Sequence, residues 1–103
     1  MRPETKTVKD ALKKQFPGCK VNIIYITAYN YAFSDDKLLI KIDVPYKDVA
    51  DFIRMNSYKI RIIPKGSYSS AVNDFDQTLF GQDTDIGFIE IESTVDMDSH
   101  LKY

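Results

Sequence analysis

The sequence predicts a single compact α+β domain, and three features of its 103 residues support that fold class. The length fits one domain and is enough for a hydrophobic core. Some stretches alternate apolar and polar residues with the two-residue period that is typical of strands, and others repeat with the period of a helix. The change of period is sharpest across residues 37–55, where Pro45 separates a strand from a helix.

The predicted order of elements is α-β-β-α-β-α-β, within one domain that spans residues 1–103. Each predicted strand offers one clean apolar stripe. A four-stranded, mostly antiparallel sheet with the helices packed on one face is therefore the simplest way to bury these stripes. Residues 1–6 and 94–103 have little to bury and are predicted to be loose ends.

The first part of the chain predicts a helix followed by a strand and a turn. Thr7 and Asp10 have the spacing of a capping box, with aspartate in place of glutamate, and Pro17 ends the helix. The stretch 21–29 is apolar on both of its alternating faces, which predicts a central strand covered on both sides. Residues 30–36 supply turn residues before the next strand.

The strand after this turn directs four apolar side chains to one face: Leu38, Ile40, Ile42 and Val44. Pro45 ends the strand because proline cannot donate a hydrogen bond to the ladder. Beyond it, Val49, Phe52 and Ile53 recur at helical spacing. Asn56 is a suitable residue to end this helix.

The last third predicts a strand, a short helix and a final strand. An alternating strand over 58–63 stops at Pro64. Two serines followed by apolar residues at helical spacing predict a helix over 69–80, with Gly81 behind it. The final strand covers 87–92, where isoleucines alternate with glutamates.

The net charge of −1 hides a gradient along the chain. Residues 1–20 carry +4, residues 21–66 carry +2 and residues 67–103 carry −7, which indicates either an interaction surface or pairing between the two ends. Cys19 is the only cysteine, so an internal disulfide is excluded. No apolar run has the length of a signal peptide or a membrane span. We therefore expect a cytoplasmic protein that does not enter a membrane.

Six charged side chains are predicted to lie on the sheet face opposite the aliphatic stripes: Lys41, Asp43, Lys59, Arg61, Glu90 and Glu92. One interpretation is a solvated face on which these charges pair, with Arg61 facing a glutamate if the last two strands are neighbours. The other interpretation is a binding face, because a sheet uncovered on one side offers a flat and rigid platform.

The chain has seven tyrosines, and Tyr29, Tyr31 and Phe33 place aromatic rings in a loop where the core does not need them. Tyrosine is a good contact residue because few torsions are frozen on binding. With the basic first helix, such rings could instead stack on bases, as in a weak binder of single-stranded nucleic acid. The glycine-aromatic signature of RNA-recognition modules and an overall basic excess are missing, which counts against this alternative.

The last third contains six aspartates that form a candidate acidic surface: Asp74, Asp76, Asp83, Asp85, Asp96 and Asp98. Ordinary solvation accounts for them, since the paired aspartates lack the glycine and terminal glutamate of a calcium loop. The alternative is a surface that imitates the nucleic-acid backbone and blocks a nucleic-acid enzyme, as small inhibitors from phages and mobile elements do.

The sequence offers little for catalysis. His100 is the only histidine and lies in the predicted tail, so a serine or cysteine nucleophile would lack an oriented base. Cys19 follows a helix end, which does not favour a thiolate. No glycine-rich phosphate loop and no Cys/His metal cluster is present, which leaves an all-carboxylate site as the remaining catalytic option. We expect neither an enzyme nor a cofactor.

These features favour a non-enzymatic module that binds another protein through the charged face and the tyrosine-rich loop. The inhibitor of a nucleic-acid-handling enzyme is the second hypothesis, and the weak single-stranded nucleic-acid binder is the third. A homo-oligomer is compatible with the sequence. None of the patterns identifies the partner.

Overall fold

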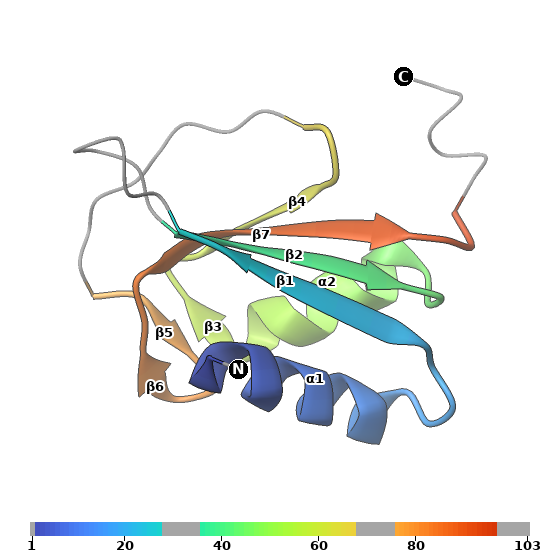
Figure 1. The fold of residues 1–103 in the computed structure, drawn as a ribbon, viewed down its shortest axis with the longest axis horizontal. Helices are drawn as coiled ribbons and strands as arrows, with labels where there is room; N and C mark the ends of the chain where they lie inside the picture. Colours follow the sequence, from blue (N-terminus) through green and yellow to red (C-terminus); the bar gives the residue numbers. More distant parts are fainter. Residues whose placement is uncertain (1, 28–35, 68–75, 97–103) are drawn as a thin grey trace.

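The computed structural model describes residues 2–27, 36–67 and 76–96 (Figure 1). The helices in these ranges are α1 (Pro3–Gln15) and α2 (Tyr46–Met55). The strands are β1 (Val21–Ile26), β2 (Asp36–Ile42), β3 (Ser57–Tyr58), β4 (Arg61–Pro64), β5 (Thr78–Leu79), β6 (Gln82–Asp83) and β7 (Ile86–Ser93). Neither of the described helices is long and apolar enough to cross a membrane.

A four-stranded mixed sheet in the order β1-β2-β7-β4 is the framework of the fold. β1 and β2 are antiparallel, whereas β7 runs parallel to both β2 and β4. The prediction of a mostly antiparallel sheet is therefore wrong. α2 connects β2 to β4 as a helical crossover, which makes these two strands run in the same direction, and β7 lies between them in that direction.

The end of the range 69–80, which was predicted to be a helix, belongs to a small antiparallel sheet in the order β3-β5-β6. Most of that range, residues 69–75, lies outside the described residues, but its end is strand β5 and not a helix. Phe80 and Gly81 have positive φ angles of 50° and 79°, and they form the two-residue turn between β5 and β6. A turn of this kind suits a tight hairpin and cannot continue a helix.

The strand predicted over 58–63 is divided between the two sheets. Tyr58 belongs to β3, Lys59 has a φ of 60°, and β4 begins only at Arg61. A positive φ on a non-glycine residue interrupts a strand, so the alternating pattern covers two short strands. β4 continues to Pro64, which is tolerated because β4 is an edge strand.

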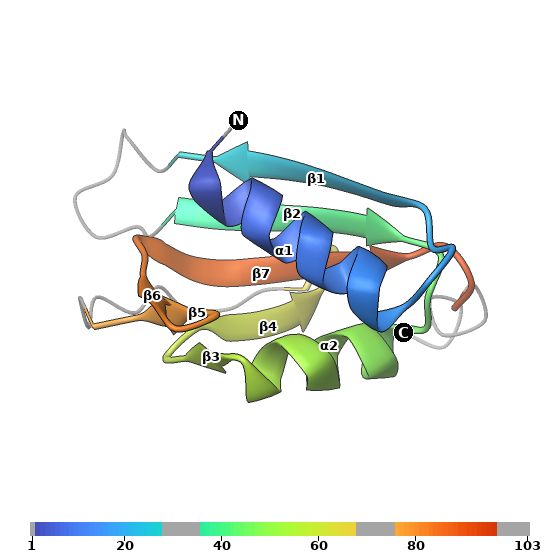
Figure 2. The same cartoon turned by 90° about the horizontal axis from the view of Figure 1, so that it is seen from below.

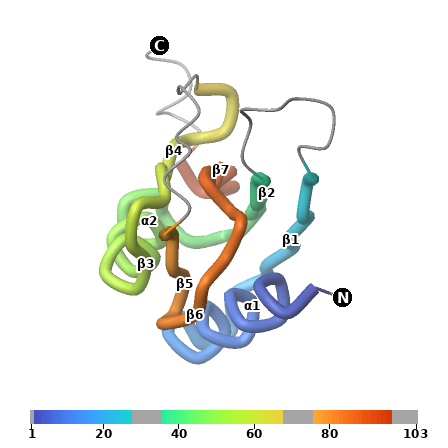
Figure 3. Tube along the Cα trace, turned by 90° about the vertical axis from the view of Figure 1, so that its left-hand side faces the viewer, coloured from blue at the N-terminus to red at the C-terminus, as the bar shows by residue number. Residues whose placement is uncertain are grey.

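Both helices lie on one side of the four-stranded sheet, as the sequence predicted (Figures 1 and 2). The small sheet lies on that same side, at one end of the molecule (Figure 3). Between these layers is a core of twelve buried apolar residues: Val8, Leu12, Leu38, Ile40, Ile42, Val49, Ala50, Ile53, Leu79, Ile86, Ile89 and Ile91. No described helix covers the opposite face of the four-stranded sheet.

The strand predicted to be central, β1, is instead an edge strand with one open face. Val21, Ile23 and Tyr25 pack against the core. Ile24 and Ile26 point to the other face and are 50% and 40% exposed. The prediction failed because apolar residues on both faces are also found where a strand exposes isoleucine to solvent or to a partner.

Parts of both predicted loose ends belong to the fold. α1 begins at Pro3 rather than at Thr7, because proline is well suited to the first turn of a helix, where no amide partner is needed. At the other end, the carboxylate of Asp96 accepts a hydrogen bond from the amide of Tyr46 at the start of α2. Asp96 therefore caps a helix that lies far from it in the sequence.

Replacing Asp96 by alanine is expected to lower the free energy of unfolding by about 1 kcal/mol. The change removes the acceptor for the Tyr46 amide and a negative charge at the positive end of α2. Urea unfolding followed by circular dichroism measures the difference. Asp83→Ala is the control, because Asp83 is exposed in β6. Equal losses in the two variants would contradict the capping role of Asp96.

Candidate functional site

The sheet face that the described helices leave uncovered is the candidate functional site, and we call it the open face. It is formed by alternate side chains of all four strands: Asn22, Ile24, Ile26, Lys37, Leu39, Lys41, Arg61, Ile63, Phe88, Glu90 and Glu92. The register aligns them in rows across the sheet, such as the row Ile24, Leu39, Glu90 and Ile63. Apolar and charged side chains are thus interspersed over one rigid surface.

Two ion pairs between described residues lie on the open face. Lys37 Nζ lies 3.1 Å from Glu90 Oε1, and Lys65 Nζ lies 3.1 Å from Glu92 Oε1. The Glu90 side chain is only 16% exposed, so this carboxylate is the more buried of the two. Both glutamates come from β7, whereas Lys37 comes from β2 and Lys65 directly follows β4. The pairs therefore connect β7 to both of its neighbours.

Lys41 and Arg61 are exposed on the open face, on β2 and β4. The sequence predicted that Arg61 would face a glutamate if its strand and the last strand were neighbours. β4 and β7 are neighbours, but their parallel register sets Arg61 beside Phe88, so the predicted pairing is wrong. Lys41 lies beside Glu92 in the register of β2 and β7.

Asp43 and Lys59 were predicted to share this face, but the structure places them elsewhere. The Asp43 carboxylate lies beyond the end of β2 and accepts a hydrogen bond from the amide of Lys20 at 2.7 Å. Lys59 lies between β3 and β4 and forms an ion pair with Asp76 at 3.0 Å. The prediction from the two-residue period is wrong for both residues, because neither lies inside a strand and the alternation of faces does not extend to them.

Three aromatic residues predicted to contact a partner lie outside the described residues: Tyr29, Tyr31 and Phe33. Tyr25, which precedes these residues in the sequence, lies on the helix side of β1. The Arg2 guanidinium lies 4.2 Å from its ring centre, and its hydroxyl donates a hydrogen bond to the Asp36 carboxylate. Burial and this hydrogen bond raise the pKa of Tyr25 above its ordinary value. Tyr25 therefore stays neutral and links the chain before α1 to the start of β2.

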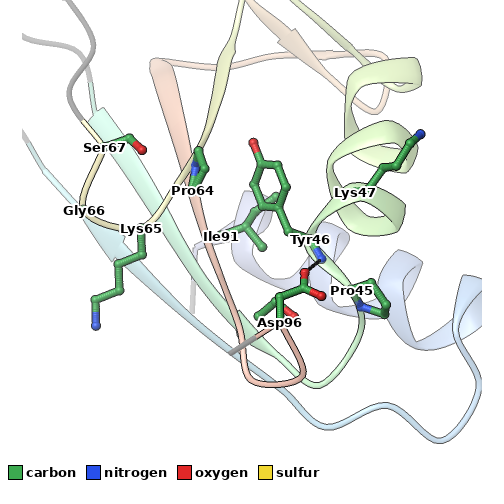
Figure 4. Close-up of a pocket in the computed structure, with 10 residues that line it drawn as sticks. Pro45, Tyr46, Lys47, Pro64, Lys65, Gly66, Ser67, Ile91 and Asp96 are labelled. Carbon is green, nitrogen blue, oxygen red and sulfur yellow. Dashed lines mark hydrogen bonds between the residues drawn. The ribbon is translucent and has the colours of Figure 1, made fainter. Parts of the chain in front are cut away.

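A groove of about 510 Å³ opens where the parallel strands end and α2 begins (Figure 4). Tyr46, Pro64 and Ile91 contribute apolar surface to its wall. The side chains of Lys47 and Lys65 start at its rim but point away from it (Figure 4). The Tyr46 hydroxyl lies close to the β4 backbone and donates a long hydrogen bond, 3.4 Å, to the carbonyl of Ile62.

Sequence reasoning missed this groove because it forms only when strands from different parts of the chain end side by side. In sheets with parallel strands, ligands commonly bind beyond the carboxyl ends of the strands. Pro45 and Pro64 were the only local signals, since each marks the end of a strand there. The positive end of α2 is occupied by the carboxylate of Asp96, so the chain supplies its own anion at this position.

The described members of the predicted acidic surface lie in two separate places. Asp76, Asp83 and Asp85 border a hollow of about 390 Å³ together with Glu4. Asp96 lies at the start of α2, beside the groove. The remaining members lie outside the described residues: Asp74 and Asp98. Within the described ranges, no group of three or more His, Cys, Asp or Glu side chains is arranged to hold a metal ion.

Cys19 is half-buried, and its thiol donates a hydrogen bond to the carbonyl of Leu12, with 3.8 Å between Sγ and the oxygen. Burial raises the pKa of the Cys19 thiol above its ordinary value. A protonated, half-buried thiol is a poor nucleophile. His100, the only histidine of the sequence, lies outside the described residues.

No protein-family model, no curated protein sequence and no solved structure matches this chain. The open face and the groove are therefore interpreted from their own geometry and chemistry.

Proposed function

We propose that this chain is a non-enzymatic interaction module that binds a partner protein through the open face. The observation that carries the proposal is the sheet surface that the described helices leave uncovered, on which Ile24 is 50% exposed next to interspersed charges. Protein interfaces combine apolar contact area with a polar rim in this way. A sheet loses little conformational freedom on binding, which lowers the cost of association.

The charges of the open face favour a protein partner over nucleic acid. Glu90 and Glu92 run along the central strand, where a phosphate backbone lying across the sheet would meet them. Carboxylates repel phosphates, and nucleic-acid affinity depends largely on unopposed lysine and arginine. Lys37 and Lys65 are already paired with these glutamates. A protein surface of mixed charge is a better match.

The exposed cations Lys41 and Arg61 provide the test. Reversing both to glutamate is expected to abolish capture of the partner and leave the thermal midpoint nearly unchanged, because exposed charges contribute little to folding. The double variant Lys13→Glu and Lys14→Glu is the control, since it changes the net charge equally on exposed positions of α1. Glu90 is not changed, because its ion pair with Lys37 connects β7 to β2 and its loss could affect folding as well as binding.

The experiment uses the immobilised chain to capture proteins from its native host, followed by direct binding of the purified partner to all three forms of the chain. Retention by wild type and control, with loss in the open-face variant, supports the proposal. Equal retention by all three removes the open face as the site. Retention of a labelled oligonucleotide by the wild type, falling steeply with salt, would favour the nucleic-acid hypotheses instead.

A further inference from the structure

β1 is an edge strand that lacks the usual protection against pairing with another strand. Edge strands are commonly protected by charged side chains, by proline or by a bulge. The sequence of β1, Val21–Ile26, contains neither a charged residue nor a proline, and no described strand pairs with its outer side (Figure 2). The opposite edge of the sheet, β4, carries both Arg61 and Pro64. Of the two edges formed by the described strands, β1 is therefore the one without these protections.

The hydrogen-bonding pattern determines which backbone groups of β1 point outward. The amide of Asp43 donates to the carbonyl of Lys20 at 3.3 Å, immediately before the first pair of β1 and β2. Hydrogen-bonded pairs alternate along an antiparallel ladder, so the even-numbered residues of β1 bond to β2. The amides and carbonyls of Val21, Ile23 and Tyr25 point away from the sheet, and no described residue pairs with them.

We propose that β1 pairs in antiparallel fashion with β1 of a second copy of this chain, about a two-fold axis at Ile23. In this register Ile23 lies opposite Ile23 of the second copy, and Val21 lies opposite Tyr25. Every outward amide and carbonyl of the strand then exchanges a hydrogen bond with the other copy. A shifted register would leave some outward amides and carbonyls without a partner, because they would lie beyond the end of the second strand. The register centred on Ile23 is therefore favoured.

The side chains of β1 also favour a second copy as the occupant. On the open face, Ile24 comes to lie opposite Asn22 of the other copy, and the two Ile24 side chains approach each other diagonally across the axis. Ile24 and Ile26 lose exposed apolar surface on both copies equally. No charge within β1 has to leave water. The same patch serves on both subunits, as a two-fold dimer requires.

This dimer goes beyond the binding of a partner protein, because its interface is the edge of the sheet and not its open face. It would join the open faces of two copies into one continuous surface. A single pair of short strands is smaller than a standard interface, so a weak dimer that depends on concentration is expected.

Sedimentation equilibrium of the wild type and of Ile24→Lys tests the pairing. The wild type is expected to dimerise as its concentration rises, and Ile24→Lys to remain a monomer, because two lysines would meet near the axis. Met55→Lys is the control, since Met55 is 84% exposed at the end of α2, and it is expected to dimerise like the wild type. A wild type that stays monomeric up to its solubility limit would overturn the proposal.

Cysteine cross-linking tests the register, in a Cys19→Ser background. Asn22→Cys and Ile24→Cys are prepared separately, mixed and mildly oxidised. Because these positions face each other in a pair without hydrogen bonds, where side chains are closest, the mixture is expected to form a disulfide-linked dimer. Each variant alone is expected to form no disulfide link between its copies. Disulfide links between two copies of Ile24→Cys, with none between Ile24→Cys and Asn22→Cys, would overturn this register.

The open-face variant with Lys41→Glu and Arg61→Glu separates this proposal from the proposed function. Neither residue lies on β1, so this variant is expected to dimerise like the wild type while losing the partner. Loss of dimerisation in this variant would contradict pairing through the edge of β1.

Discussion

Ile40→Asp is expected to leave the chain unfolded under conditions in which the wild type is folded. Ile40 is fully buried in the middle of β2, between β1 and β7 on the helix side of the sheet. A carboxylate at this position would lose its hydration without gaining a partner, which costs about 4–5 kcal/mol or more. Domains of this size are stable by only about 5–15 kcal/mol in total, so most or all of the stability would be lost.

The control introduces an aspartate on the open face of the neighbouring strand β1. Ile24→Asp is expected to lower the free energy of unfolding by less than about 1 kcal/mol, because Ile24 is half-exposed and a carboxylate there keeps its water. Circular dichroism and urea unfolding compare the two variants. Similar midpoints for Ile40→Asp and the wild type would contradict the assignment of the core to the helix side of the sheet.

The face of each long strand was predictable from the sequence. Leu38, Ile40 and Ile42 were assigned to the core from their two-residue period, and all are buried. Ile89 and Ile91 were assigned in the same way, also correctly. These predictions succeed because the direction of a side chain relative to its strand is a local property. α2 was located equally well, since Pro45 and Asn56 flank it in the structure.

The neighbours of each strand were not predictable, because pairing is decided by contacts between distant parts of the chain. The final strand, β7, lies between β2 and β4 and runs parallel to both, which no local pattern indicates. β1 appeared central because it is apolar on both faces, yet it lies at the edge. The turn at Phe80 and Gly81 was missed because phenylalanine rarely adopts a positive φ.

For the candidate site, too, the face of each side chain was predictable from the sequence and its partner was not. Lys41, Arg61, Glu90 and Glu92 share the open face because their positions in the strands have the same parity. Which charges pair depends on the register between strands, and the partner of Glu90 proved to be Lys37. Lys37 has the same parity as Lys41, so the sequence contained the signal for its face but not for its pairing.

Ile89→Ala is expected to lower the free energy of unfolding by about 2–5 kcal/mol, the range for removing a large buried aliphatic side chain. Ile89 is fully buried on β7, and β7 is the strand that holds β2 and β4 together. The lost methyl groups leave a cavity between the sheet and the helices, and neighbours on both sides prevent the strand from moving to fill it.

Ile63→Ala distinguishes this cavity effect from a simple loss of apolar surface in the sheet. Ile63 lies on the open face of β4, beside Glu90 of β7, and is only partly buried. A smaller loss is expected there, about 1 kcal/mol, because solvent and mobile side chains fill the space that the truncation leaves. Urea unfolding at equilibrium measures both variants. If Ile63→Ala proved as damaging as Ile89→Ala, the open face would have to be covered, by a second copy or by a part of the chain beyond the described residues.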